Sequence, residues 1–330
     1  MHNHEVLLLI SSDPPTRYEG IARLAGEHGW HLRAESRRSP PKDWSGDGVL
    51  VMLNGDEALM RFARSVRRRK IPMVDLLEEC PDFDAVRVTG DNPEIGRLAA
   101  THFNERDFRH AAFFSVRHNH THDLRVAGFN EIWRGRPLEN WIWPDVAGAG
   151  QDDWRKMGAW LAAKLKDAPK PFAVFAWNDY DATHVLNACR QADLKVPDDV
   201  SIIGVDNNEV ICEHQSVNLS SIAHDHERIG YMAAATLERM MSGGEPSRRH
   251  ACGRRLRGRL RACVRSGGRV VMFGRQAVLT GLALAAALNV GAAMTNEWET
   301  AGAKSVRFEV KFLRTPRVRY AEQNSAELAE

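Results

Sequence analysis

The stretch Phe172-Ala-Val-Phe-Ala-Trp-Asn-Asp179 decides the fold class of this 330-residue chain. Five consecutive apolar residues lead into a Trp and two polar side chains. A continuous apolar run of this length is typical of a strand that is buried on both faces of a parallel sheet. Similar runs occur at residues 6–10, 49–53, 72–76, 111–114 and 200–205.

Amphipathic segments separate the apolar runs and predict helices. These segments cover residues 17–28, 56–69, 94–106, 124–134, 153–167, 179–192 and 227–242. Several begin after Asp or Asn and end near Gly, as helices commonly do. Alternating strands and helices predict an α/β fold in which helices cover both faces of a parallel sheet. Because the number of strand–helix units is larger than one small sheet accommodates, we predict two doubly wound parallel-sheet lobes.

Polar side chains follow three of the apolar runs. Asp13 follows the first run, Asn178 and Asp179 follow the run at 172–176, and Asp206 follows the run at 200–205. The carboxyl ends of parallel strands meet at one edge of a sheet, where ligands bind. A carboxylate there can accept hydrogen bonds from two adjacent sugar hydroxyls, and Trp177 could stack on a sugar ring. The alternatives are that each Asp or Asn only caps the next helix and that Trp177 only packs in the core.

Charge is unevenly distributed along the chain. Residues 248–330 contain 16 Lys and Arg against 6 Glu, whereas residues 1–247 contain 29 Lys and Arg against 37 Asp and Glu. Phosphate contacts need Lys and Arg, so nucleic acid should not bind over the general surface of the acidic part. The five cysteines form no CxxC pair, and the amino terminus lacks a signal-peptide pattern. We therefore expect a cytoplasmic protein without disulfides.

Four motifs in order resemble the effector domains of LacI/GalR-type transcription regulators. They are Val88-Thr-Gly-Asp-Asn-Pro-Glu-Ile-Gly96, Ala173-Val-Phe-Ala-Trp-Asn-Asp179, Val196-Pro-Asp-Asp-Val-Ser-Ile-Ile-Gly-Val-Asp-Asn207, and Leu219-Ser-Ser-Ile222 followed by Ile229-Gly-Tyr-Met-Ala-Ala234. The resemblance covers about residues 5–245. This stretch is similar to the effector half of the xylose-operon regulator (XylR) family. It implies a periplasmic-binding-protein-like type I clamshell, with a first lobe at 1–90 and 223–245 and a second lobe at 91–222.

The same resemblance implies a small sugar effector, xylose or a similar monosaccharide, held between the lobes. It carries ligand contacts onto Asn178, Asp179 and Asp206, and onto Arg125 of the pattern Arg125-Val-Ala-Gly-Phe129. Asp13 and Tyr18 match less closely, because Pro14-Pro15 changes that loop. Family members are commonly homodimers that regulate transcription. A transport-type sugar-binding protein is the alternative within this fold.

Residues 246–330 depart from the family pattern. No helix-turn-helix is recognisable there or at the amino end, so DNA is a partner only if a functional module or the basic tail permits it. We interpret this atypical tail as frameshifted or disordered. Three alternatives stay open: the eight arginines within 248–265 hold phosphates, residues 277–294 span a membrane, or residues 305–312 form an amphipathic strand.

We expect no catalysis, cofactor or metal. The sequence has no GxSxG, GxxxxGK[ST] or GxGxxG signature after a strand, although Asp179 and Asp206 leave a carbohydrate-active enzyme as an alternative. His118, His120 and His122, with Asp123, suggest a metal site, but alternate spacing gathers three imidazoles on one side only in an extended segment. We interpret them as a polar loop at the mouth of the crevice.

Overall fold

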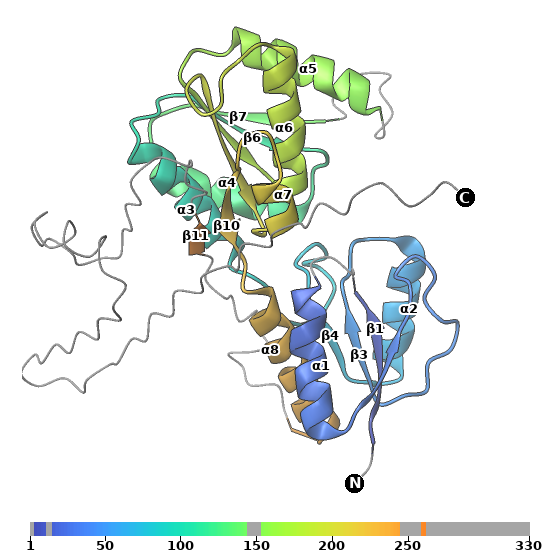
Figure 1. The fold of residues 1–330 in the computed structure, drawn as a ribbon. Helices are drawn as coiled ribbons and strands as arrows, with labels where there is room; N and C mark the ends of the chain where they lie inside the picture. Colours follow the sequence, from blue (N-terminus) through green and yellow to red (C-terminus); the bar gives the residue numbers. More distant parts are fainter. Residues whose placement is uncertain (1–2, 11–14, 144–152, 245–258, 262–330) are drawn as a thin grey trace, which may run out of the picture. The chain divides into compact units, whose positions relative to one another are not determined.

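A computed structural model describes residues 3–10, 15–143, 153–244 and 259–261. It confirms the predicted α/β class: two parallel sheets are each flanked by helices (Figure 1). The chain divides into compact units at residues 1–270 and 271–330, and the second unit lies outside the described residues.

The first sheet has the strand order β2-β1-β3-β4-β5, and all its strands are parallel. Its strands are β1 (Glu5–Leu9), β2 (His31–Ala34), β3 (Gly48–Val51), β4 (Met73–Asp75) and β5 (Val86–Arg87). Helices α1 (Thr16–His28) and α8 (His226–Met241) lie side by side on one face, and α2 (Glu57–Arg68) covers the other (Figure 1). Side chains of β1 alternate between the two cores: Leu8 packs with α1 and α8, and Leu7 packs with α2.

The second sheet has the order β11-β10-β9-β8-β6-β7. Its strands are β6 (Ala111–Ser115), β7 (Leu138–Ile142), β8 (Phe172–Ala176), β9 (Val200–Val205), β10 (Ser220–Ala223) and β11 (Arg259–Arg261). Helices α3 (Asn92–Asn104) and α4 (His120–Ile132) cover one face, α5 (Trp154–Asp167) and α6 (Asp179–Gln191) cover the other, and the short α7 (Glu209–Glu213) follows β9. Phe113 and Phe175 pack toward α3 and α4, and Phe114 and Val174 pack toward α5 and α6.

The chain passes between the sheets at two described segments. It leaves the first sheet after Arg87 and enters α3 at Asn92, and it returns between Ala223 and His226. The lobe boundaries expected at 90/91 and 222/223 stay a prediction. Residues 259–261 form β11, which pairs antiparallel with β10. The other segments of the tail that the sequence singles out, including 277–294 and 305–312, lie outside the described residues.

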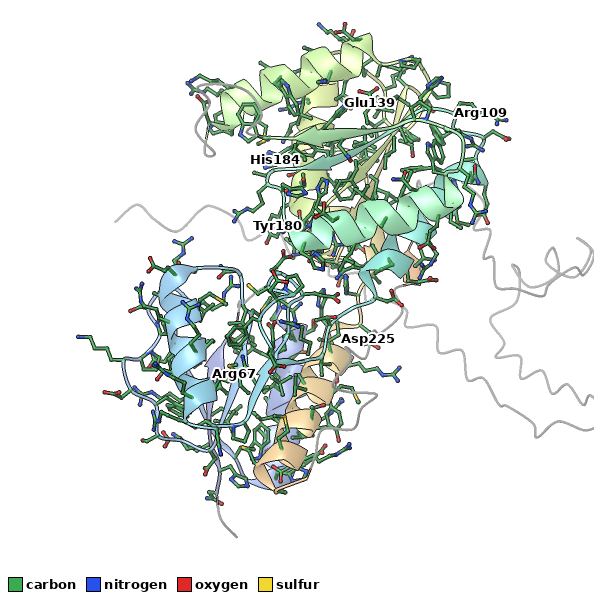
Figure 2. The ribbon with its side chains drawn as sticks, turned by 180° about the vertical axis from the view of Figure 1, so that it is seen from behind. Arg67, Arg109, Glu139, Tyr180, His184 and Asp225 are labelled. Carbon is green, nitrogen blue, oxygen red and sulfur yellow. The ribbon has the colours of Figure 1, made fainter. Side chains whose placement is uncertain are left out.

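The elements that the sequence analysis missed are mainly polar edge strands. β2 reads His-Leu-Arg-Ala and β7 reads Leu-Glu-Asn-Trp-Ile, and each lies at an edge of its sheet. An edge strand is covered less completely than a central one, so it lacks the continuous apolar run of a central strand. In β7, Glu139, which is labelled in Figure 2, accepts a hydrogen bond of 2.9 Å from Trp141 Nε1. Among the described helices, none combines the length and the hydropathy of a membrane span.

Candidate functional site

A cavity of about 480 Å³ lies beside the carboxyl ends of strands from both sheets, within the usual volume of small-molecule sites of about 300–1,000 Å³. The first sheet contributes residues that follow β1, β3 and β4, the second contributes residues that follow β6, β8 and β9, and the two connecting segments complete the wall. The polar lining residues are Arg17, Arg37, Asn54, Glu78, Glu79, Thr89, Asn92, Arg117, Asn119, Thr121, Arg125, Asn178, Asp179, Tyr180, Asp181, Asp206, Asn208, His224 and His226.

Arg125 is buried at this cavity and is held in a fixed orientation. Its Nε donates to Asn92 Oδ1 at 3.1 Å, and one terminal nitrogen donates to the carbonyl of Trp177. The other terminal nitrogen lies 3.4 Å from Nε2 of His224. Burial lowers the pKa of Arg125, and the carboxylate of Asp206 acts against this shift. An arginine remains charged under such conditions, so the cavity contains a positioned cation.

The backbone of α4 brings Arg125 to this place through close helix packing. A Cβ added to Gly96 of α3 would lie 2.0 Å from the carbonyl oxygen of Arg125, and one added to Gly128 would lie 1.9 Å from the carbonyl of Pro93. Only glycine permits this approach of two helix backbones. Gly96 and Gly128 therefore set the position from which Arg125 reaches the cavity.

Asp206 follows β9 and has an unusual backbone conformation. Its φ is +100°, and the φ of the next residue, Asn207, is +52°. Two successive non-glycine residues with positive φ store strain of about 1–3 kcal/mol each, which is typical of functional sites. The side chain of Asp206 is 29% exposed, and Oδ1 lies 3.4 Å from Nε2 of His226. Burial raises the pKa of Asp206, but the N–H of His226 that faces it and the guanidinium of Arg125 outweigh burial and hold the pKa well below its ordinary value.

Two histidines of the second connecting segment lie beside Asp206. The rings of His224 and His226 stack with centroids 5.0 Å apart and planes at 19°. Arg17 lies 2.8 Å from Nδ1 of His226, and since a guanidinium only donates, Nδ1 accepts and the ring proton is on Nε2, facing Asp206. Burial is the largest cause that lowers the pKa of His224 well below its ordinary value, so its ring is neutral at pH 7.

Asp179 lines the cavity, but bonds within the fold occupy both of its oxygens. Oδ1 accepts a hydrogen bond of 2.7 Å from Ser221 Oγ, and Oδ2 accepts one of 2.7 Å from the Asn208 backbone N–H. Burial raises its pKa to about 7, although these hydrogen bonds act in the opposite direction. Asp179 therefore joins the ends of β8 and β9 to β10, and this structural role limits its freedom to turn toward a ligand.

Asn178 and Trp177 also line the cavity, with different local roles. Asn178 caps α6, since its Oδ1 accepts a hydrogen bond of 2.7 Å from the backbone N–H of Asp181. The helix-cap alternative of the sequence analysis therefore applies to Asn178. The indole ring of Trp177 lies 5.2 Å from the guanidinium carbon of Arg125. Tyr180, labelled in Figure 2, lies in the first turn of the same helix and is 50% exposed.

Of two further residues that the sequence analysis singled out, only Tyr18 can be compared with the described cavity lining. Tyr18 is absent from the lining because its hydroxyl turns back to the carbonyl of Ile10, at 3.4 Å. Asp13 lies outside the described residues.

Sequence reasoning missed several polar residues of the cavity. Asp181, Arg17, Asn92 and His226 are on helices, and His224 is in a connecting segment. The rule that polar residues follow buried strands would have found Asn54, which directly follows the apolar run at 49–53. That rule carries no information about a helix residue that reaches a cavity from another element.

Three buried polar atoms of the cavity wall have no hydrogen-bond partner among the described residues. They are Thr89 Oγ1, Trp177 Nε1 and His226 Nε2, the last of which makes only the 3.4 Å contact with Asp206. Leaving such groups unpaired costs about 1–3 kcal/mol each. A polar ligand that accepts from the two N–H groups would remove part of this cost.

Residues 100–259 match the family described as a periplasmic binding protein-like domain. The chain is similar to xylose operon regulatory proteins of Haemophilus influenzae, with 27% identity over 163 residues, and of Escherichia coli K12, with 25% identity over 242 residues. These alignments cover 48% and 69% of this chain. They cover 42% and 60% of the relatives, so the chain spans about half the length of the curated relatives it matches.

A solved structure titled as that of the xylose-binding transcription activator xylR has the same fold. Its TM-score is 0.62 at 21% identity, and the match covers 74% of this chain and 65% of that one. The fold, the family match and the sequence similarity agree with the resemblance that the motifs indicated. The chain therefore has a periplasmic-binding-protein-like fold, matches a periplasmic binding protein-like domain at residues 100–259, and is similar in sequence to xylose operon regulatory proteins.

Proposed function

We propose that this chain is the effector-binding part of a transcription regulator and that a small sugar binds in the cavity. The observation that carries the proposal is the convergence of Arg125, Asp206 and His226 on one cavity wall, where buried N–H and O–H groups lack partners. Sugars supply adjacent hydroxyls that both donate and accept, which suits a wall with carboxylate acceptors and cationic or N–H donors.

Asp206 and Arg125 are the residues that we assign to direct sugar contact. The carboxylate of Asp206 is partly exposed and can accept from two adjacent hydroxyls. Arg125 has donors close to the same cavity and is fixed by Asn92. We assign Trp177 a stacking role, while Asn178 and Asp179 contribute mainly by fixing α6 and the ends of the strands. Asp13 and Tyr18 remain weaker candidates.

Xylose or a similar monosaccharide is the effector class that we propose. Two relatives are named for the xylose operon, and the named solved structure is described as xylose-binding. A cytoplasmic homodimer and regulation of DNA binding are part of the same proposal and rest on the same relatives. Affinity that differs between two conformations of the regulator, rather than binding alone, would produce the regulation.

A carbohydrate-active enzyme is less well supported by the geometry. Glycoside hydrolysis needs a protonated acid and a second carboxylate free to act on the substrate. The raised pKa of Asp179, about 7, suits an acid, but both oxygens are already bonded to Ser221 and Asn208. We therefore propose binding without turnover.

A thermal-shift panel of monosaccharides tests the proposal. At 100 times the dissociation constant, binding stabilises the folded state by about 2.7 kcal/mol, which raises the Tm of a domain of this size by roughly 5–10 °C. We expect a pentose such as xylose to give the largest shift. Arg109→Ala is a suitable control, since Arg109 is an exposed residue that does not line the cavity (Figure 2). Absence of a shift with every sugar at millimolar concentration would contradict the proposal.

A further inference from the structure

The side chains of His118, His122 and Asp123 converge where α4 begins. One candidate ligand atom from each lies within 4.8 Å of the other two, and His118 Nε2 is 2.6 Å from Asp123 Oδ1. Over the ranges that the structure describes, this is the one group of three or more His, Cys, Asp or Glu side chains with an arrangement suited to a metal ion.

The start of α4 creates this arrangement. Asn119 caps the helix by accepting a hydrogen bond of 2.9 Å from the His122 backbone N–H. His118 thus precedes the helix, and His122 and Asp123 follow four and five residues later, on the first turn. The three histidines at alternate positions are not gathered here, and the helical turn brings His118, His122 and Asp123 together instead. His120, the middle histidine of the sequence pattern, is not in the group.

His122 is buried and oriented in the way that a metal ligand requires. Its ring is buried, and Nδ1 lies 2.9 Å from the hydroxyl of Ser115 on β6. When Nδ1 donates its proton to Ser115, Nε2 retains a lone pair for a metal ion, and such an outer partner usually accompanies a ligating histidine.

We propose that His118, His122 and Asp123 bind a divalent transition-metal ion, with Zn²⁺ the best match. Two imidazoles and one carboxylate are common zinc ligands, whereas Mg²⁺ and Ca²⁺ prefer oxygen ligands alone. Tetrahedral zinc places its ligand atoms about 3.3 Å apart, given bonds of about 2.0–2.2 Å. The 2.6 Å contact between His118 and Asp123 would have to lengthen, and both side chains are more than half exposed, at 54% and 55%.

Three protein ligands leave a fourth position open to solvent on the exposed side. The positive end of the α4 dipole opposes a cation at this place, and the negative charge of Asp123 offsets that effect. Asn119 and Thr121, which line the cavity, belong to the same segment, and Thr121 donates a hydrogen bond to Glu79 after β4. A bound ion would hold this segment of the cavity wall in place.

Titration of the full chain with Zn²⁺ by calorimetry tests the site. We expect His118→Ala and Asp123→Asn each to weaken Zn²⁺ binding at least about 10-fold, because loss of an outer-shell partner alone costs about 10- to 100-fold. Ser115→Ala should fall within that outer-shell range. Both ligand variants change exposed side chains and should fold, whereas the buried His122 is left unchanged.

The matched control is His120→Ala, which removes a histidine two residues from His118 that is outside the group. It should retain wild-type Zn²⁺ affinity. Co²⁺ titration should give visible absorption bands that His118→Ala abolishes and His120→Ala does not. The proposal is overturned if the wild-type chain binds no Zn²⁺, if both ligand variants bind it as tightly as wild type, or if His120→Ala loses as much affinity. Asp206→Asn should keep Zn²⁺ binding, which separates this test from that of sugar binding.

Discussion

The carboxylate of Asp206 and the imidazole of His226 connect the two sheets at the cavity, with Oδ1 and Nε2 3.4 Å apart. Asp206 follows β9 in the second sheet, whereas His226 begins α8, which packs against the first sheet. Arg17 of α1 lies behind the imidazole, at Nδ1. Helices α1 and α8, which are far apart in the sequence, therefore both set the electrostatic environment of the Asp206 carboxylate.

Asp206→Asn should abolish most of the thermal stabilisation by sugar while the fold remains intact. Asn tolerates the positive φ of this position, so the backbone conformation should be retained. The substitution removes the charged oxygen that accepts hydrogen bonds from sugar hydroxyls. Loss of one charge-assisted hydrogen bond costs about 1.5–3 kcal/mol, or roughly 10- to 150-fold in affinity. Calorimetric titration measures this change, with Asp107→Asn as the control. Unchanged affinity in Asp206→Asn would remove Asp206 from the site.

Arg125→Lys should weaken sugar binding more than it weakens the fold. Lys keeps the positive charge but cannot reproduce the three directions in which Arg125 now meets Asn92, Trp177 and His224. We expect at least about a 10-fold loss of affinity, with circular dichroism like that of wild type. Equal affinities for the two proteins would show that the fork geometry of Arg125 has no role in binding.

His102 should make stability depend on pH in the acidic range. It is buried in α3, and burial, with the charge of Arg106 next, lowers its pKa to about 4. The unfolded chain has a histidine pKa of about 6.5, so between pH 6.5 and 4 the unfolded state binds more protons and stability falls as pH falls.

Urea unfolding of wild type and His102→Gln at pH 7.5 and pH 5 measures this effect. Gln does not titrate, so wild type should lose on the order of 2 kcal/mol relative to the variant over this interval. A constant difference between the two proteins at both pH values would contradict the assignment.

Gly96→Ala should destabilise the protein strongly. The new methyl group would lie 2.0 Å from the carbonyl oxygen of Arg125 and 2.6 Å from the backbone nitrogen of Phe129, so α3 and α4 must separate. Overpacking costs about 1–3 kcal/mol or more, and backbone atoms cannot turn aside as side chains do.

Gly26→Ala in α1 is the matched control, since nothing lies within 4 Å of its added Cβ. That change should stabilise the helix by about 0.5–1 kcal/mol. Thermal denaturation should therefore shift the two variants in opposite directions, and similar shifts would contradict the packing argument.

Asp225→Ala should remove the cap of α8. The carboxylate of Asp225, a residue labelled in Figure 2, accepts a hydrogen bond of 3.1 Å from the backbone N–H of Arg228. Loss of a helix N-cap costs about 1 kcal/mol, or roughly 2–4 °C in Tm. Asp225→Asn retains the oxygen acceptor and should stay within about 1 °C of wild type. If the Tm of Asp225→Asn falls as far as that of Asp225→Ala, the charge of Asp225 rather than its capping hydrogen bond stabilises the helix.

Much of the fold is readable from the chain because central strands of a parallel sheet are buried on both faces. The runs at 172–176 and 200–205 form β8 and β9 with the predicted bounds, and the predicted helix at 153–167 is α5, which begins at Trp154. Edge strands such as β2 lack that signal because they are less covered. The sequence of β11 has no apolar run at all, because its pairing with β10 determines that it forms a strand.

The amino-acid sequence by itself determined that Asn178, Asp179 and Asp206 would gather at one edge of a sheet, because parallel strands end on the same side. Only the tertiary structure decided their roles. Ser221 and Asn208 occupy the oxygens of Asp179, whereas Asp206 remains partly exposed beside His226. The reason is physical: a pattern along the chain fixes on which side of a sheet a residue lies, but the partners of its polar atoms come from helices many residues away. His226 is 209 residues from Arg17, and no local pattern joins them.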